Sequence, residues 1–298
     1  MRISTCQDEI RTITARINYL ASGSFINRRF VAPGEEVNTG TYESHAVKIH
    51  DGRSIKERFT LDTHGYLLAE HKSGVQDFFN QEEVDAIYPG EVLELVKSLT
   101  GASCAAQLGW MVRTSGDLSK FRRQTVGYTH KGGVQPPAGE AHVDMTPDRA
   151  EAMAKEIYQR CFPDGKAYRR FIASSLWRTF SPPPQDWPLA VCEGNSVGSE
   201  EGTPNTMFIV DQLPDRVAML GEIPDEASAP AADVFHYNPH HRWWYFSGMH
   251  RDEVLLFKFH DSDRTRAWRV PHTAFSDPSF PEAHTHESIE FRTVAFFL

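Results

Sequence analysis

The stretch HRWWYFSGMHRDEVLLFKFHDSDRTRAWRVPHTAF, residues 241–275, contains three apolar runs separated by turn-forming residues. Each run is rich in aromatic or aliphatic residues and is bounded by Gly, Asp, Ser or Pro, a pattern typical of β-strands. The stretch therefore predicts three consecutive strands, at 241–249, 252–262 and 265–275.

The flanking sequence extends this pattern in both directions. Five further strands are predicted, at 168–180, 187–194, 205–213, 217–223 and 287–298. Eight short strands at this spacing favour an all-β sandwich or a barrel-like core. The connecting stretches 182–188 and 224–233 are predicted to be a rigid proline-rich loop and a mobile surface loop.

The first half of the chain is mixed in character. A helix is predicted at 80–101, where Asn80 is a suitable N-cap, Gly101 a suitable end and Pro89 an interruption. The remaining predictions are strands at 12–21, 43–53 and 102–114, a strand-turn-strand unit at 59–71, and a loop at 115–140. Because no composition shift marks a boundary, we expect one domain over 1–298, mainly β with flanking helices, whose N-terminal portion (about 1–115) contains a helix.

Composition excludes several classes of protein. The net charge of -9 argues against a partner nucleic acid, which usually selects a basic face. No apolar run approaches the roughly 18 residues of a membrane helix, so no membrane is expected as a partner. The absence of a secretory h-region and the scattered cysteines indicate a cytoplasmic protein. Homodimer formation is compatible with the sequence.

One short motif suggests a metal site. In GEAHVDMTP (139–147), His142 and Asp144 precede a helix predicted at 146–162, with Thr146 as N-cap and Pro147 in its first turn. On an extended segment two residues separated by one project to the same face. An imidazole and a carboxylate joined by a second, distant histidine would form a facial triad, which suits Fe(II) and leaves positions open. A polar turn that happens to contain a histidine is the alternative.

The 14 histidines offer many third ligands, and most of them must be surface or packing residues. His260 and His272 stand out because each lies at the end of a predicted strand. The full set of candidates is His236, His240, His241, His250, His260, His272, His284 and His286.

A centre that uses a dicarboxylate such as 2-oxoglutarate also needs a cation to hold the distal carboxylate. Arginine is favoured because its planar fork matches a carboxylate. Arg292 lies in the apolar strand ESIEFRTVAFFL, where an arginine is costly without a partner. A structural ion pair with Glu290 or Asp261 is the alternative explanation.

Several segments together resemble the AsaB-type hydroxylase/desaturase family of oxygenases, which includes CmcJ-like and gibberellin desaturase-like proteins. The resemblance covers nearly the whole chain and implies a double-stranded β-helix (jelly-roll, cupin-like) core. The segments are TARINYL (14–20), IHDGR (49–53), LDTHGYLLAEH (61–71), AHVDMTP (141–147), LWRTFSPPPQDWPLAVCEG (176–194), NPHHRWWYFSGMHRDEVLLFKFHDSD (238–263), VPHTAFSDP (270–278) and ESIEFRTVAFF (287–297).

The resemblance also implies which residues form the site. AHVDMTP supplies His142 and Asp144 as metal ligands, and VPHTAF supplies His272. ESIEFR supplies Arg292 as the residue that holds 2-oxoglutarate, although the loop at 276–287 makes its separation from His272 longer than usual. Arg178 is the competitor, followed by Arg266 and Arg269. The family often has a tyrosine in place of His260, so His260 is not expected to be a ligand, and Asp261 is expected to be structural.

The function implied is that of an Fe(II)/2-oxoglutarate-dependent dioxygenase. With O2, such an enzyme oxidises an unactivated C–H bond of a small molecule in secondary metabolism, by hydroxylation, desaturation or oxidative cyclisation. An S-adenosylmethionine-dependent methyltransferase would need a glycine-rich loop in a βαβ unit, which GGVQPPAGE (132–140) does not provide. A non-enzymatic jelly-roll binding module would not need the complete set of ligands. The aromatic residues that could wall a pocket, or simply pack the core, are Trp177, Trp187, Trp243, Trp244 and Tyr245.

Overall fold

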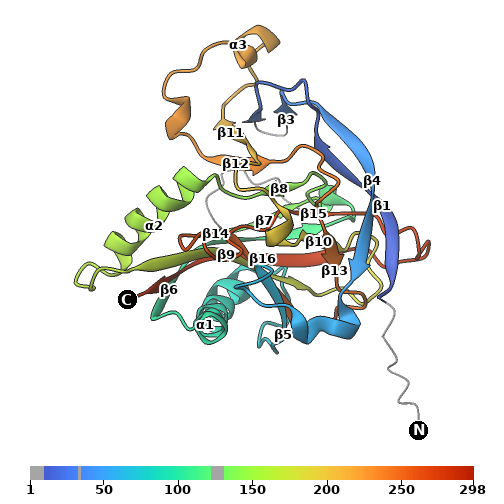
Figure 1. Cartoon of the computed structure of the whole chain (residues 1–298), viewed down its shortest axis with the longest axis vertical. Helices are drawn as coiled ribbons and strands as arrows, with labels where there is room; N and C mark the ends of the chain where they lie inside the picture. The colour runs from blue at the N-terminus through green and yellow to red at the C-terminus, as the bar shows by residue number, and fades with distance from the viewer. Residues whose placement is uncertain (1–9, 33–34, 122–130) are drawn as a thin grey trace.

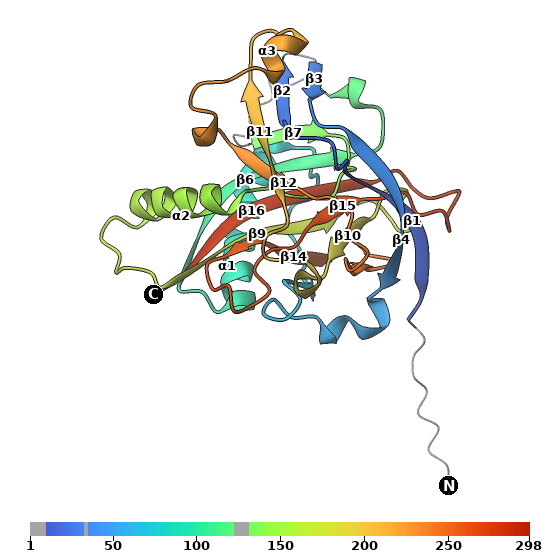
Figure 2. The ribbon, with the colours of Figure 1, turned by 45° about the horizontal axis from the view of Figure 1, so that its top comes forward.

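Two β-sheets packed face to face form the centre of the molecule. The computed structural model describes residues 10–32, 35–121 and 131–298, and Figures 1 and 2 show the two sheets in two orientations. The ten-stranded sheet contains, in spatial order, β1 (Thr12–Leu20), β4 (Tyr42–Asp51), β13 (Trp243–Tyr245), β10 (Leu189–Cys192), β15 (His272–Ala274), β8 (His142–Val143), β12 (Ala231–Val234), β11 (Thr203–Ile209), β2 (Arg28–Ala32) and β3 (Glu35–Asn38). The six-stranded sheet contains β5 (Tyr66–Glu70), β14 (Glu253–Asp261), β9 (Arg170–Thr179), β16 (Glu287–Phe297), β6 (Cys104–Thr114) and β7 (Lys131–Gln135).

The burial of each strand explains its sequence pattern. Strand β1 lies at an edge with one face in solvent, so buried and exposed residues alternate along it. Strand β14 is covered on both faces and is buried at every position, which is why LLFKFH reads as an almost continuous apolar run. The mainly β architecture predicted from the eight C-terminal runs is therefore confirmed.

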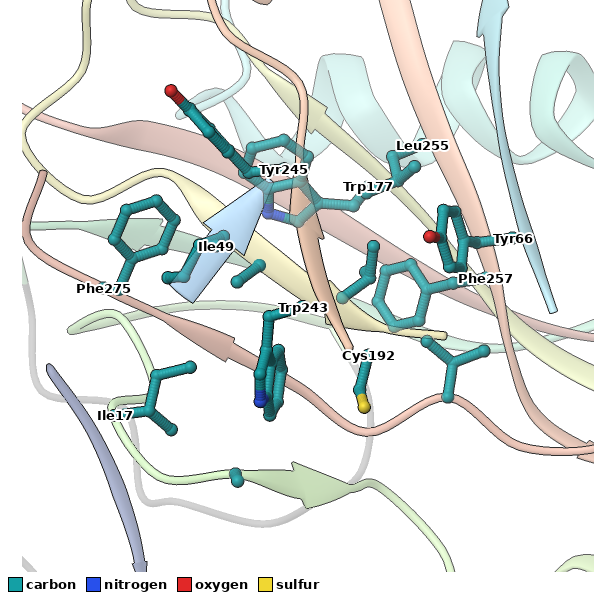
Figure 3. Close-up of a cluster of buried hydrophobic side chains, with 14 of the residues drawn as sticks. Ile17, Ile49, Tyr66, Trp177, Cys192, Trp243, Tyr245, Leu255, Phe257 and Phe275 are labelled. Atoms are coloured by element: carbon teal, nitrogen blue, oxygen red, sulfur yellow. The ribbon is translucent and has the colours of Figure 1, made fainter. Parts of the chain in front are cut away.

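The main core fills the space between the two sheets. Figure 3 shows side chains from the ten-stranded sheet, such as Trp243 and Cys192, meeting Trp177 and Phe257 from the six-stranded sheet. Trp243 is fully buried and donates a hydrogen bond from its indole nitrogen to the Tyr19 hydroxyl, at 2.7 Å. This core fixes the separation of the sheets, and with it the position of every side chain that points inward.

Helix α1 (Gln81–Thr100) covers the outer face of the six-stranded sheet. The Asn80 side chain accepts a hydrogen bond from the backbone N–H of Glu83, and Gly101 ends the helix with a φ of 73°. The prediction that Pro89 interrupts this helix is wrong, because the helix continues through it. Interior proline costs about 3 kcal/mol, and burial of a stripe of side chains against the sheet outweighs that cost; the stripe is Val84, Tyr88, Val92 and Val96.

Helix α2 (Pro147–Cys161) packs where β9 begins and β16 ends. Its buried residues, which include Ala150, Ala154 and Ile157, join Phe171 and Phe296 in a separate apolar cluster. Thr146 occupies the N-cap position as predicted, but its side chain makes no capping hydrogen bond. Among the described residues, no helix has the length and apolar character needed to cross a bilayer.

Several predicted elements differ in the structure. Residues 217–223 were expected to be a strand, but Arg216–Leu220 forms helix α3, which the Asp215 side chain caps at the Ala218 N–H. The expected loop at 224–233 contains the start of β12, and residues 59–65 form a turn instead of a strand. The expected loop at 115–140 contains β7, and its part at 122–130 lies outside the described residues.

Other differences concern length. The strands predicted at 241–249 and 265–275 shrink to the three residues each of β13 and β15, and β2 and β3 were not predicted. Short strands of this kind are stabilised by their partners in the sheet, which a single run of sequence does not reveal. Short 3-10 helices complete the structure, at Arg53–Arg58, Leu118–Lys120, Gly194–Ser196 and Glu226–Ser228.

Candidate metal centre

Strands β8 and β15 bring two distant histidines to one point. The strands are antiparallel neighbours, and His142 lies directly opposite His272 in their register. Directly opposed residues share a face of the sheet, and their ring centroids are 4.4 Å apart. Asp144 follows two residues after His142 on the same face, and its Oδ1 lies 3.4 Å from His142 Nε2 and 3.2 Å from His272 Nε2. One ligand atom from each of the three residues lies within 4.8 Å of the others.

The backbone selects which ring nitrogen of each histidine faces this point. The Nδ1 of His142 lies 2.8 Å from the carbonyl oxygen of Glu140, and the Nδ1 of His272 lies 3.2 Å from that of Val270. A carbonyl oxygen only accepts, so each Nδ1 carries the proton and donates it. Each Nε2 then faces Asp144 and, once it is deprotonated, offers its lone pair to a metal ion, which is the tautomer that metal-binding histidines adopt. The donor set of two imidazole nitrogens and one carboxylate oxygen fits ferrous iron.

The charges around the centre keep the carboxylate ionised. Burial alone would raise the pKa of Asp144, but the charge of Arg292 and hydrogen bonds from both histidines hold that pKa well below its ordinary value. Burial acts to lower the pKa of His142, yet the neighbouring Asp144 raises it overall. Burial and the charge of His142 lower the pKa of His272. A metal cation placed here would take over the role of the protons that the three side chains now share.

Arg292 contacts this group directly. It extends from β16 on the inner face of the six-stranded sheet, with its side chain only 9% exposed. Its Nε lies 2.6 Å from Asp144 Oδ2, and its guanidinium donates to Glu290 Oε1 at 2.5 Å. Arg113, from β6, donates to the same Glu290 carboxylate at 2.8 Å. The alternative explanation for Arg292 is a structural ion pair with Glu290 or Asp261. The structure does pair Arg292 with Glu290, whereas Asp261 pairs with Arg170 and Lys258.

The structure does not bring the three competing arginines to the centre. Arg178 lies on the opposite face of the same sheet, where it is completely buried against α1. Its guanidinium donates to the Tyr88 hydroxyl and to the carbonyl oxygens of His71 and Arg251. Arg266 pairs with Asp62 and Asp263, while Arg269 pairs with Asp233.

Three of the other candidate histidines make their contacts away from the centre. His260 is buried between Phe171 and Trp268 on the side of the sheet that faces α2. His241 binds Glu201 at 2.6 Å, and His236 binds the carbonyl oxygen of Leu20 at 2.8 Å. Among the residues that the structure describes, His142, Asp144 and His272 form the one group of three with metal-binding geometry.

A cavity opens beside the two histidines, between the sheets. It encloses about 370 Å³, a figure that includes its open mouth. Trp177 and Phe257 form apolar walls, and Trp187 stands at the cavity with 37% of its surface exposed. Trp243 and Tyr245 instead pack in the core. His286, one of the candidate third ligands, also lines the cavity. The lining residues that sequence reasoning did not assign to a site are Arg113, Pro137, Ala138, Leu189, Phe257, Thr273, Ala274 and Glu290.

Two signals in the sequence could have found part of this lining. Glu290 stands two residues before Arg292 in a strand, and so on the same face. Residues Thr273 and Ala274 adjoin the histidine of VPHTAF. Arg113 gave no comparable signal, and His286 was only one of eight candidate histidines, because the positions of both depend on how distant strands pair.

A largely buried site with two histidines, one carboxylate and a neighbouring arginine defines a non-haem metal centre in a double-sheet fold. A family model described as an oxidoreductase/YMDC permease-like domain matches residues 17–296. The hydroxylase/desaturase CTB9 of Cercospora beticola is 31% identical over 80% of this chain and 72% of its own length. The hydroxylase/desaturase efuI of Hormonema carpetanum is 29% identical over 96% of this chain and 95% of its own length.

The fold has a counterpart among solved structures. The iron and alpha-ketoglutarate-dependent endoperoxidase NvfI superposes with a TM-score of 0.73, at 23% identity, over 96% of this chain and 98% of that one. The likeness confirms the expected jelly-roll core. The chain belongs to the hydroxylase/desaturase family of non-haem Fe(II)/2-oxoglutarate-dependent oxygenases.

Proposed function

We propose that the protein is an Fe(II)/2-oxoglutarate-dependent dioxygenase that oxidises a small molecule of secondary metabolism with O2. In this proposal His142, Asp144 and His272 hold the iron, and Arg292 receives the distal carboxylate of 2-oxoglutarate. The observation that carries it is the convergence of two Nε2 atoms and one carboxylate oxygen, with both Nδ1 atoms tied to backbone carbonyls. Family membership favours this activity over that of a methyltransferase.

The bound iron and 2-oxoglutarate would supply, with O2, the oxidising power for hydroxylation, desaturation or oxidative cyclisation at an unactivated carbon. The chain supplies geometry and charge. The carbonyl oxygens of Glu140 and Val270 fix the orientation of the two imidazole rings. The apolar side chains of Trp177 and Phe257 exclude water from the cavity beside the ligands.

Arg292 is favoured as the cosubstrate residue because of what surrounds it. It stands next to the ligand Asp144 and is held by carboxylates, which are the same chemical group that 2-oxoglutarate presents. Arg178 is saturated by a hydroxyl and carbonyl oxygens on the far face of the sheet. Arg292 is therefore the arginine better suited to bind the distal carboxylate of 2-oxoglutarate.

The test is anaerobic titration of the metal-free protein with Fe(II) and 2-oxoglutarate, followed by the weak visible charge-transfer band of the chelate. His142→Ala is expected to abolish the band, and Arg292→Ala to shift the 2-oxoglutarate response to higher concentration. The matched control is His260→Ala, which removes a buried histidine that lies against α2. A band that survives in His142→Ala, or that disappears in His260→Ala, would contradict the assignment.

Three further points belong to the same proposal. We infer that residues 1–298 act as one oxygenase domain, that the protein works in the cytoplasm without nucleic acid or membrane partners, and that homodimers are compatible with it. Gel filtration with light scattering checks the oligomeric state. A non-enzymatic binding module would gain support if neither Fe(II) nor 2-oxoglutarate with metal raised the melting temperature.

A further inference from the structure

Four charged side chains of alternating sign run from the cavity wall to the metal centre. Arg113 donates to Glu290 at 2.8 Å, Arg292 donates to Glu290 at 2.5 Å, and Arg292 Nε lies 2.6 Å from Asp144 Oδ2. The side chains are 14%, 12%, 9% and 4% exposed in the order Arg113, Glu290, Arg292, Asp144. We call these four residues the charge chain. Because they are shielded from water, each charge acts strongly on its neighbours.

The charge chain joins two strands and the segment after β8. Glu290 and Arg292 lie on β16 and share its inner face, while Arg113 comes from the neighbouring strand β6. Burial opposes ionisation of Glu290, but the charges of Arg113 and Arg292 outweigh it and hold the pKa of Glu290 below its ordinary value. Glu290 is therefore a carboxylate placed between two arginines, and only one of these arginines contacts the ligand Asp144.

We propose that Glu290 is a positioning residue that sets how available Asp144 is to a metal ion. Glu290 shares the guanidinium of Arg292 with Asp144, so it weakens the hold of Arg292 on the ligand. Arg113 in turn attracts Glu290 and weakens its pull on Arg292, so Arg113 strengthens the contact of Arg292 with Asp144. This inference rests on the proposed function, because it takes Asp144 to be a metal ligand and Arg292 to be the cosubstrate residue.

The alternating signs give opposite expectations for two conservative variants. Glu290→Gln keeps the shape but removes the negative charge, which leaves Arg292 to Asp144 and adds net positive charge beside the metal. Arg113→Gln lets Glu290 attract Arg292 more strongly. Arg292 then holds Asp144 less strongly, and the Asp144 carboxylate is more available to a metal ion. Loss of a partner next to a metal ligand typically changes metal affinity by about 10- to 100-fold. A residue with a purely structural role would weaken metal binding in both variants.

The test is titration of the metal-free full-length protein with Mn(II), in which free Mn(II) is measured by electron paramagnetic resonance. Glu290→Gln is expected to bind Mn(II) about ten-fold more weakly than wild type, and Arg113→Gln more tightly. In the double variant the effect of Arg113→Gln is expected to vanish, because the charge through which it acts is gone. Arg170→Gln is the control: it breaks an ion pair with Asp261 at the other end of β9 and is expected to leave Mn(II) affinity unchanged.

The outcomes separate this inference from the proposed function. Wild type that fails to bind Mn(II), or His142→Ala that binds it normally, would overturn both. Normal binding in wild type, with Glu290→Gln and Arg113→Gln unchanged or shifted in the same direction, would overturn the inference alone. If Glu290→Gln does not fold, Arg113→Gln decides: tighter Mn(II) binding supports the inference, and equal or weaker binding overturns it.

Discussion

The six-stranded sheet carries a buried arginine on each of its two faces. Arg178 on β9 points toward α1, and Arg292 on β16 points toward the cavity, from neighbouring strands. Arg178 is surrounded by neutral acceptors, namely the Tyr88 hydroxyl, the carbonyl oxygens of His71 and Arg251, and the Nδ1 of His71. Arg292 is held by the carboxylates of Asp144 and Glu290.

This difference separates a structural arginine from one that can bind a ligand. Neutral acceptors provided by the backbone are fixed, and a carboxylate that arrives from solution cannot replace them without disrupting the backbone around His71 and Arg251. Carboxylate partners can be exchanged for another carboxylate at little change in charge. The apolar surroundings of an arginine therefore say less about its role than the chemical type of its partners.

The largest expected effect tests the structural side of the comparison. Arg178→Met is expected to lower the free energy of unfolding by about 3 kcal/mol, because several buried acceptors lose their donor. The affinity of the folded variant for 2-oxoglutarate is expected to equal that of wild type. Urea denaturation and calorimetric titration measure the two quantities. Weaker 2-oxoglutarate binding in this variant would make Arg178 the cosubstrate residue.

The second prediction tests the binding side. Arg292→Gln is expected to weaken 2-oxoglutarate binding to the Mn(II)-loaded protein by about 100-fold, because a bidentate pair in a shielded site is lost. Arg292→Lys keeps the charge but not the planar fork, so its affinity for 2-oxoglutarate is expected to lie between those of wild type and Arg292→Gln. Isothermal titration calorimetry gives both constants. Unchanged affinity in Arg292→Gln would remove the distinction between the two faces.

The third prediction compares the two buried arginines with His260, a buried base that is uncharged at neutral pH. Neither ring nitrogen of His260 has a hydrogen-bond partner among the described residues, and burial followed by the charge of Arg264 lowers its pKa from 6.5 to about 4. The unfolded chain therefore binds this proton more readily than the folded chain between pH 6.5 and about 4. Stability from this residue is present above pH 6.5 and is lost as the pH falls through that window.

The corresponding measurement is urea denaturation at a series of pH values. His260→Phe is expected to show a shallower loss of stability than wild type between pH 6.5 and about 4. Parallel curves for the two proteins would show that His260 titrates normally in the fold. Buried His286, whose pKa burial and the charge of Arg113 lower to about 3, contributes with the same sign and remains in both proteins.

The smallest expected effect concerns a single hydrogen bond. Tyr88→Phe removes the hydroxyl that accepts from Arg178 Nε at 3.1 Å, and is expected to cost about 1 kcal/mol of stability. Metal and 2-oxoglutarate binding should not change, since α1 lies on the outer face. Thermal unfolding and Mn(II) titration decide this. A change in Mn(II) affinity would show that the two faces of the sheet are coupled.

Local patterns predicted the parts of the site that depend on short segments. The alternation of side chains in an extended strand is enough to place His142 and Asp144 together, and it also places Glu290 beside Arg292. The choice of His272 among eight histidines required the resemblance to a family. Nothing in the sequence near residue 272 states that β15 pairs with β8, because that pairing is set by the whole ten-stranded sheet.

The misread elements have the same origin. VAMLGEI at 217–223 has strand-like composition, but Asp215 caps a short helix there. Residues 231–234 look like a loop and become β12 because β8 and β11 flank them on both sides. Pro89 is tolerated in α1 because tertiary packing supplies more free energy than the lost hydrogen bond. In each instance the neighbours in space outweighed the local preference.

The pairing of β8 with β15 is very short, since β8 has two residues and β15 has three. Side chains on a strand alternate between faces, so a slip of β15 by a single residue would turn His272 away and present Pro271 or Thr273 to His142. A cation bound to both imidazole rings would oppose such a slip and stabilise the register of β8 and β15. Deleting one residue just before His272 should thus be far more harmful than lengthening the loop at 276–286.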